Sequence, residues 1–241
     1  KDIKNLDNVD HWIKMVATNR LTGHSKGFFS VYTLPPNQAA SANRQIQINL
    51  KRNQSPEYKD TSKIILNKSK QLLRKVSLTE SENLLRASKE ALILECDASK
   101  TNKIPSSSVK LTVTSPPFLN IVNYAQDNWL RAWFNNIDLK TLTEKITMSK
   151  NLEEWSDKMR GVFAEIYRVS KKDGIVAFEV GEIKNGKINL EDSIIPIAEE
   201  SGFNILEIMI NSQNFTKTSN IWGISNNQRG TNTNRIVLMK K

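Results

Sequence analysis

Residues 111–118 have the types and spacing needed to hold a flat, polar ligand. The run Leu111-Thr112-Val113-Thr114 predicts a short buried strand, which ends at Ser115-Pro116-Pro117-Phe118. Proline has no N–H and fixes its own φ, so two consecutive prolines stop a sheet ladder and stiffen the backbone. The expected result is a rigid corner that presents a hydroxyl, backbone carbonyls and an aromatic face. Such a corner suits an unstacked nucleobase, whose amino group donates hydrogen bonds.

The chemistry that this corner favours is transfer of a group to an exocyclic amine. That amine is a weak nucleophile in cytosine and adenine because its lone pair is delocalised into the ring. Two acceptors, the Ser115 hydroxyl and the Pro116 carbonyl, would bind the amine protons and favour a pyramidal nitrogen. Pro117 would fix the direction of the carbonyl, and Phe118 would stack on the base, a contact worth ~1–3 kcal/mol. Positioning supplies the remaining catalysis, and no acid, base or metal is required.

The elements that would position the corner follow an α/β pattern from residue 91 onward. Apolar runs predict strands at 91–96, 111–114, 175–180, 203–210 and 235–239, and helices at 125–135, 151–170 and 191–201. Alternating strands and helices are typical of a parallel sheet, and ligands bind at the carboxyl ends of its strands. We expect Cys96 to be a buried, inert thiol, and Trp129, Trp133 and Phe134 to pack in the core.

The first 90 residues are basic and mostly helical in pattern. They contain 16 Lys and Arg against 8 Asp and Glu, a net +8, whereas residues 91–241 have a net +2. Helices are predicted at 7–21 and 61–76, with another beginning near Thr79, and a short strand is predicted at 28–32. Residues 41–60 show no clear period and predict a DNA-contacting loop that uses Arg44, Lys51 and Arg52; a plain linker is the alternative.

The segment Thr114-Ser115-Pro116-Pro117-Phe118 resembles the catalytic motif of the amino-methylating DNA methyltransferases, in which Asp, Asn or Ser precedes Pro-Pro and an aromatic residue. The serine form resembles the cytosine-N4 branch more than the adenine-N6 branch. Segments 168–174, 220–223 and 230–236 are also similar to such enzymes. The resemblance implies a Rossmann-like, S-adenosylmethionine-dependent methyltransferase sheet at 91–241, and residues 1–90 would be an inserted or DNA-recognition region.

The same resemblance implies the cofactor, the partner and further site residues. S-adenosylmethionine would donate the methyl group, and double-stranded DNA with a flipped base would accept it, in a restriction-modification context. Asp97, after the first strand, would bind the adenine amino group of the cofactor; a turn aspartate is the alternative. Asn123 and Tyr124 would line the base pocket, with loop capping as the alternative.

One expected feature is missing, because the sequence contains no Gly-x-Gly and hence no glycine-rich cofactor loop. The order of the strands implies that the first two strands of the sheet belong before residue 1. We therefore expect a second polypeptide to supply them, unless the chain is a truncated product. Two alternative functions stay open: adenine-N6 methylation, and a non-catalytic DNA-binding subunit of a split methyltransferase.

Composition argues against several classes of protein: membrane-spanning, secreted and metal-binding proteins. No apolar run approaches the ~20 residues of a membrane span, and residues 1–4 do not resemble a signal peptide. The single cysteine suits a reducing compartment, so we expect a cytoplasmic protein without disulfides. The two histidines, His11 and His24, are not part of a ligand-like cluster, so we expect no metal site.

Overall fold

The computed structural model describes residues 5–23, 25–30, 33–34, 38–117, 124–145, 149, 151–183, 188–212 and 233–241. The chain divides into two compact units. The first unit comprises residues 1–93 and 123–146, and the second comprises residues 94–122 and 147–241. The division near residue 90 follows the change in sequence pattern, whereas segment 123–146 belongs with the first unit.

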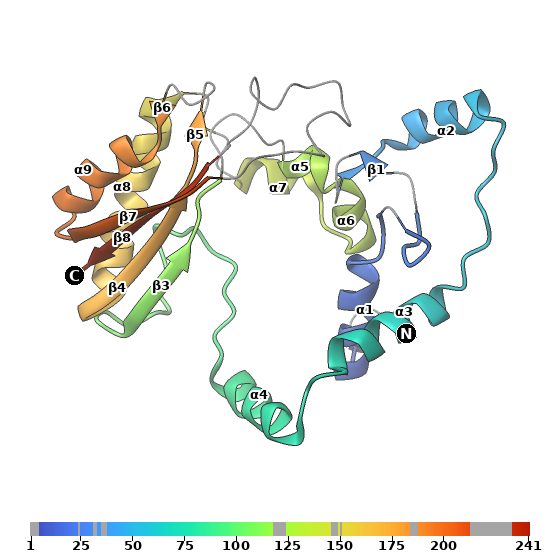
Figure 1. Cartoon of the computed structure of the whole chain (residues 1–241), viewed down its shortest axis with the longest axis horizontal. Helices are drawn as coiled ribbons and strands as arrows, with labels where there is room; N and C mark the ends of the chain where they lie inside the picture. The colour runs from blue at the N-terminus through green and yellow to red at the C-terminus, as the bar shows by residue number, and fades with distance from the viewer. Residues whose placement is uncertain are drawn as a thin grey trace. The chain divides into compact units, whose positions relative to one another are not determined.

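The second unit contains a four-stranded sheet in the order β3 (Val109–Thr114), β4 (Ser170–Val180), β8 (Thr233–Lys240) and β7 (Asn204–Ser212) (Figure 1). Strands β3 and β4 are parallel, and β8 is antiparallel to both of its neighbours. Strand β7 therefore runs in the same direction as β3 and β4. A small antiparallel pair, β5 (Glu182–Ile183) and β6 (Ile188–Asn189), follows β4. The predicted α/β class is confirmed.

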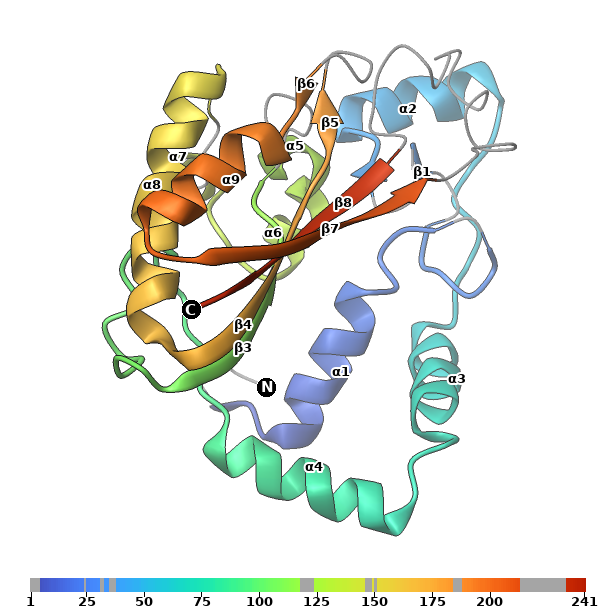
Figure 2. The ribbon, with the colours of Figure 1, turned by 60° about the vertical axis from the view of Figure 1, so that its left-hand side comes forward.

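Helices α8 (Leu152–Val169) and α9 (Glu191–Glu200) cover the same face of this sheet (Figure 2). The predicted helix at 151–170 is confirmed as α8, and four apolar residues that recur every three or four positions on it are buried: Trp155, Met159, Phe163 and Ile166. They pack against alternate residues of the two central strands, Val176 and Phe178 of β4 and Val237 and Met239 of β8. This packing forms the core of the unit.

The opposite face of the sheet is more open at the β3 edge. Leu111 and Val113 point away from the helix-covered face, since they pair in register with Ile175 and Ala177 rather than with the buried residues of β4. Leu111 is 59% exposed and Val113 is 73% exposed. Strand β3 therefore presents apolar side chains to solvent, contrary to the buried strand that the sequence predicts.

The first unit contains α1 (Asn8–Thr18), α2 (Ala42–Lys51), α3 (Thr61–Leu73), α4 (Leu78–Glu90), α5 (Tyr124–Asp127), α6 (Trp129–Phe134) and α7 (Leu139–Lys145), with a short antiparallel pair of β1 (Thr33–Leu34) and β2 (Gln38–Ala39). Helix α1 is joined to α3 by a hydrogen bond that the Trp12 indole donates to the Ser69 hydroxyl at 2.9 Å. It is joined to the residue after α6 because the Asn135 amide donates to the Thr18 hydroxyl at 3.2 Å.

The predicted strand at 91–96 is wrong. These residues form no strand, Ile93 is 94% exposed, and the Cys96 thiol is exposed rather than buried. A short apolar run becomes a strand only when a neighbouring strand pairs with its backbone, and within the described residues none does so here. The apolar pattern was therefore insufficient evidence for an element at this place.

The predicted loop at 41–60 is also wrong in its first half, because residues 42–51 form helix α2. The Ser41 hydroxyl caps this helix by accepting a hydrogen bond from the Arg44 N–H. Helix α4 begins at Leu78 and is capped by Ser77, which forms a capping box with Glu80. This cap lies two residues before the start that the sequence predicts near Thr79. The predicted helix at 125–135 is interrupted at Asn128, and Trp133 is 69% exposed rather than in the core.

Candidate active site

The corner after β3 lies at the carboxyl end of two adjacent parallel strands. Thr114, the last residue of β3, pairs with Phe178 near the end of β4. Ser115 follows and is exposed, whereas Pro116 and Pro117 are half-buried. The structure therefore places this segment at the sheet edge where open α/β sheets bind ligands. Phe118, the aromatic residue of the motif, lies outside the described residues.

Trp155 of α8 holds the corner in place through a hydrogen bond. Its indole N–H donates a hydrogen bond to the Pro117 carbonyl at 3.4 Å, and its ring is only 2% exposed. Among the described residues, neither the Ser115 hydroxyl nor the Pro116 carbonyl has a hydrogen-bond partner. The corner thus combines one anchored carbonyl with two acceptors that are free to bind a ligand.

The other end of β3 is held by a network between α8 and the segment before the strand. The Glu165 carboxylate accepts hydrogen bonds from the Thr101 N–H at 2.7 Å and from Arg168 at 2.7 and 2.8 Å. Arg168 also donates to the Ser106 hydroxyl at 2.9 Å and to the Ile104 carbonyl at 3.0 Å. The hydrogen bonds from Arg168 and Thr101 lower the pKa of Glu165 to about 2. Strand β3 is therefore fixed to the same helix at its start and at its end.

A buried ion pair joins α9 to β8 on the helix-covered face. The Arg235 guanidinium donates to Glu191 Oε1, and the two side chains are 14% and 4% exposed. Within the described residues, the second carboxylate oxygen of Glu191 is buried without a partner. Because Arg235 pairs with Val180 in the adjacent strand, this ion pair secures the carboxyl end of β4.

Asp97 does not end a strand, so the structural premise for its predicted role is wrong. Its carboxylate accepts hydrogen bonds from the N–H and the hydroxyl of Ser99, both at 2.8 Å, which is the turn geometry that the alternative interpretation expected. The bonds from the Ser99 backbone and side chain lower the pKa of Asp97. A role for Asp97 toward the cofactor stays a prediction.

The other predicted residues are spread over both units or fall outside the described residues. Arg44 and Lys51 lie on α2, and Arg52 is its C-terminal cap. Tyr124 begins α5 in the first unit, and Asn123 lies outside the described residues, as does segment 220–223. Among the predicted site residues that the structure describes in the second unit, Ser115, Pro116 and Pro117 lie together at the end of β3. Trp155 was missed because a tryptophan in an apolar stripe predicts packing and nothing more.

The described residues contain neither a metal-binding cluster nor a helix that could span a membrane. No group of three or more histidine, cysteine, aspartate or glutamate side chains is arranged to hold a metal ion in those residues. None of the helices formed by the same residues has the length and apolar character of a membrane span.

Residues 109–240 match the model of a family described as DNA methylase. The match covers more than half of the 241 residues and runs from the first residue of β3 to the last residue of β8. A comparison with curated proteins finds no match.

Solved structures show more distant likeness. A protein from Thermus thermophilus, assigned as a DNA modification methylase, is 21% identical with a TM-score of 0.36 over 60% of this chain and 50% of that one. Its complex with S-adenosyl-L-methionine is 19% identical with a TM-score of 0.35 over 60% and 53%. The cyclase SpnF is 12% identical with a TM-score of 0.35 over 96% and 80%. The chain thus spans about half the length of the Thermus protein.

Proposed function

The chain belongs to the N6/N4 DNA methylase family, and we propose that it transfers a methyl group to the exocyclic amine of a flipped base in DNA. The methyl donor of this family is S-adenosylmethionine, and the sheet that the match spans is the expected Rossmann-like α/β methyltransferase sheet. The observation that carries the proposal is the corner itself. Two acceptors without partners among the described residues, Ser115 Oγ and the Pro116 carbonyl, sit beside a carbonyl anchored by Trp155.

Each residue of the corner has a part in the proposed reaction. The Ser115 hydroxyl and the Pro116 carbonyl accept hydrogen bonds from the two amine protons, so the nitrogen lone pair is directed away from the ring. With the donor bound, the amine nitrogen would form a bond to the methyl carbon as the sulfonium S–CH3 bond breaks and leaves a neutral thioether, and the nitrogen would lose one proton to water. Trp155 keeps the corner from turning by holding Pro117, and this rigidity is the source of the positioning effect. Phe118 stacks on the flipped base.

We favour N4 of cytosine as the acceptor. The support is the hydroxyl of Ser115, since a neutral acceptor at this position is typical of the cytosine-N4 branch, whereas the adenine-N6 branch mostly carries aspartate. Adenine-N6 methylation is the alternative product. A restriction-modification context follows from the family and is part of the same proposal.

The cofactor requires a segment that the 241 residues do not provide. When bound, S-adenosylmethionine supplies an electrophilic methyl group, but the sequence has no Gly-x-Gly that would cradle it. We propose that a segment outside these 241 residues supplies the loop, either on a second polypeptide or on a longer form of this chain. The exposed Leu111 and Val113 on the edge strand are the apolar surface that it would cover.

The test is methylation of DNA in a methylation-deficient host. The chain is expressed alone and with its adjacent reading frame, and the nucleosides are then analysed by mass spectrometry. We expect N4-methylcytosine only when a glycine-rich partner is present, and none when Ser115→Ala replaces the wild-type chain. N6-methyladenine would correct the acceptor, and equal methylation by Ser115→Ala would refute the role of the corner. DNA binding is measured in parallel with methylation. If every chain tested lacks both methylation and DNA binding, misfolding explains the result rather than a missing catalytic group.

A further inference from the structure

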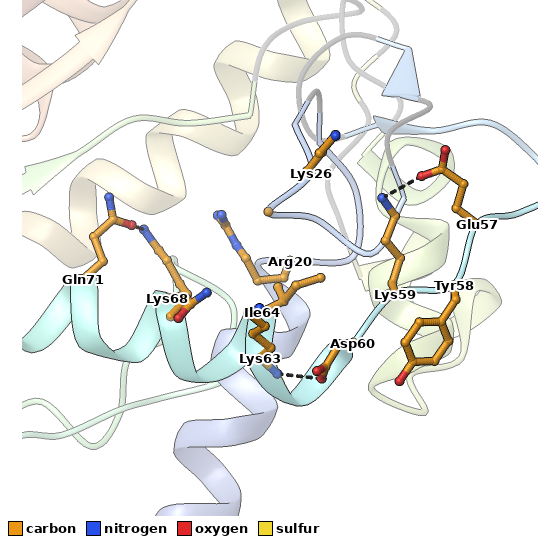
Figure 3. Close-up of a pocket in the computed structure, with 12 residues that line it drawn as sticks. Arg20, Lys26, Glu57, Tyr58, Lys59, Asp60, Lys63, Ile64, Lys68 and Gln71 are labelled. Atoms are coloured by element: carbon orange, nitrogen blue, oxygen red, sulfur yellow. Dashed lines mark hydrogen bonds and ion pairs between the residues drawn. The ribbon is translucent and has the colours of Figure 1, made fainter.

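A cavity of about 700 Å³ in the first unit has five cationic side chains among the twelve residues that line it (Figure 3). It lies between the loop that follows α1 and the first turns of α3. Its cations are Arg20, Lys26, Lys59, Lys63 and Lys68, and its carboxylates are Glu57 and Asp60. Five cations against two carboxylates leave a surplus of three positive charges.

Both carboxylates of the cavity are already engaged. Glu57 forms an ion pair with Lys59 at 3.6 Å. Asp60 caps α3, because its carboxylate accepts a hydrogen bond from the Lys63 N–H at 2.9 Å. Among the described residues, the ammonium groups of Lys26 and Lys63 have no ion pair, and Lys68 donates only to the neutral Gln71 amide at 2.8 Å. The positive charge of the cavity is therefore largely uncompensated.

The loop after α1 is built to hold Arg20 in one place. Its guanidinium lies over the Phe28 ring, 3.9 Å from the ring centre. Backbone hydrogen bonds close the loop, from Phe29 to the Arg20 carbonyl at 2.8 Å and from Gly23 to the Ser30 carbonyl at 3.0 Å. A Cβ at Gly23 would lie 2.3 Å from the Phe28 ring, so glycine is needed for the ring to support Arg20. The arginine is therefore preorganised rather than a mobile surface cation.

The lysines of α3 are spaced along one wall of the cavity, as Figure 3 shows. Lys63 and Lys68 are five residues apart, which corresponds to a rise of about 7.5 Å along the helix. Five positions also correspond to a rotation of about 140° around the helix axis, so the two side chains leave α3 in different directions and can contact separate phosphates. The hydrogen bond from Trp12 to Ser69 holds this part of α3 against α1.

We propose that this cavity binds the phosphate backbone of duplex DNA. The inference rests on the proposed function, because it takes DNA as the substrate. A polymer is favoured over a free phosphate, since a second cavity of about 280 Å³ adjoins the first through Glu57 and Lys59 and is lined by the amides of Gln45, Asn49 and Gln54. Amides of this kind bind base edges, whereas cations bind phosphates. The three cations predicted from the sequence to contact DNA do not line the 700 Å³ cavity: Arg44, Lys51 and Arg52.

The experiment measures binding of a short fluorescent DNA duplex to the full chain by anisotropy, without cofactor, over a series of salt concentrations. Replacing Lys63 and Lys68 together by alanine should reduce the slope of log K against log salt by about 2, because each phosphate contact contributes about 0.9. The matched control is Lys70→Ala with Lys89→Ala, which removes the same charge from exposed positions on α3 and α4 outside the cavity. The control should leave the slope unchanged.

Three results would overturn the inference: equal slopes for the two double variants, preference for an RNA duplex of the same sequence, or full competition by inorganic phosphate. Lys63→Gln and Lys68→Gln, tested one at a time, should each lower the slope by about 0.9, and these milder single variants decide the question even if the double alanine variant does not fold. Ser115→Ala separates this inference from the proposed function. If Ser115→Ala keeps the slope while no methylation is found for any chain, the proposed reaction fails and the phosphate site stands.

Discussion

Replacing Trp155 by phenylalanine should loosen the corner at Ser115–Pro117 while leaving the rest of the sheet in place. The substitution removes the indole N–H that reaches the Pro117 carbonyl at 3.4 Å, and it leaves a gap beneath the corner because the ring is only 2% exposed. An acceptor left without its donor costs about 1–3 kcal/mol, and a bond of this length belongs at the lower end. With the lost ring volume, we expect a decrease of about 2–3 kcal/mol in the free energy of unfolding.

The measurement combines urea unfolding with amide hydrogen exchange of a peptide that covers residues 109–115. Exchange in this peptide should be faster in Trp155→Phe than global unfolding accounts for, because the end of β3 opens locally. The matched control is Ile194→Ala on α9, which is fully buried, contacts the β7 and β8 side of the sheet and should cost about 2–5 kcal/mol.

The comparison separates anchoring from general packing. If the two variants lose similar stability and show the same exchange in residues 109–115, Trp155 only fills the core, and the rigid corner has another cause. If exchange is faster in Trp155→Phe alone, the anchoring of Pro117 is supported without any measurement of methylation.

Two further predictions concern the ion pairs of the second unit. Glu165 has a pKa of about 2 in the folded chain, against an ordinary value of 4.5. Its contribution to the free energy of unfolding is therefore complete above pH 4.5 and is lost as the pH falls toward 2. Urea unfolding between neutral and acidic pH should show this loss, and Glu165→Gln should not show it. Arg235→Met should lower the free energy of unfolding by about 3–5 kcal/mol, because it leaves the buried Glu191 carboxylate unpaired. Combining Arg235→Met with Glu191→Leu should recover most of that loss. Equal unfolding free energies for the single and double variants would contradict this prediction.

Local pattern was sufficient for the elements that have a strong period or a clear stop. The patterns at 151–170 and 191–201 predicted α8 and α9, and the Pro-Pro pair marked the end of β3. These predictions succeed because side-chain periodicity, missing N–H groups and capping residues act within a few residues of the chain. The motif at Ser115–Pro117 was found for the same reason, since all of its members are adjacent.

Pairing and burial could not be predicted in the same way. The apolar run at 91–96 looks like a strand, yet it has no partner among the described strands, and Cys96 is exposed as a result. The segment after Ser41 forms helix α2, although none of its residues is buried. Whether a run becomes a strand, or a tryptophan such as Trp133 becomes buried, depends on residues far away in the sequence.

The sequence by itself determined the chemistry of the chain: a hydroxyl and a carbonyl held by two prolines, next to a basic region and without a glycine-rich loop. Only the tertiary structure decided how that chemistry is supported. It placed the Trp155 indole against Pro117 across 38 positions and gathered Arg20, Lys63 and Lys68 around one cavity. The physical reason is that hydrogen-bond donors and cations act through distance in space, and folding alone brings residues that are distant in sequence to within a few ångströms.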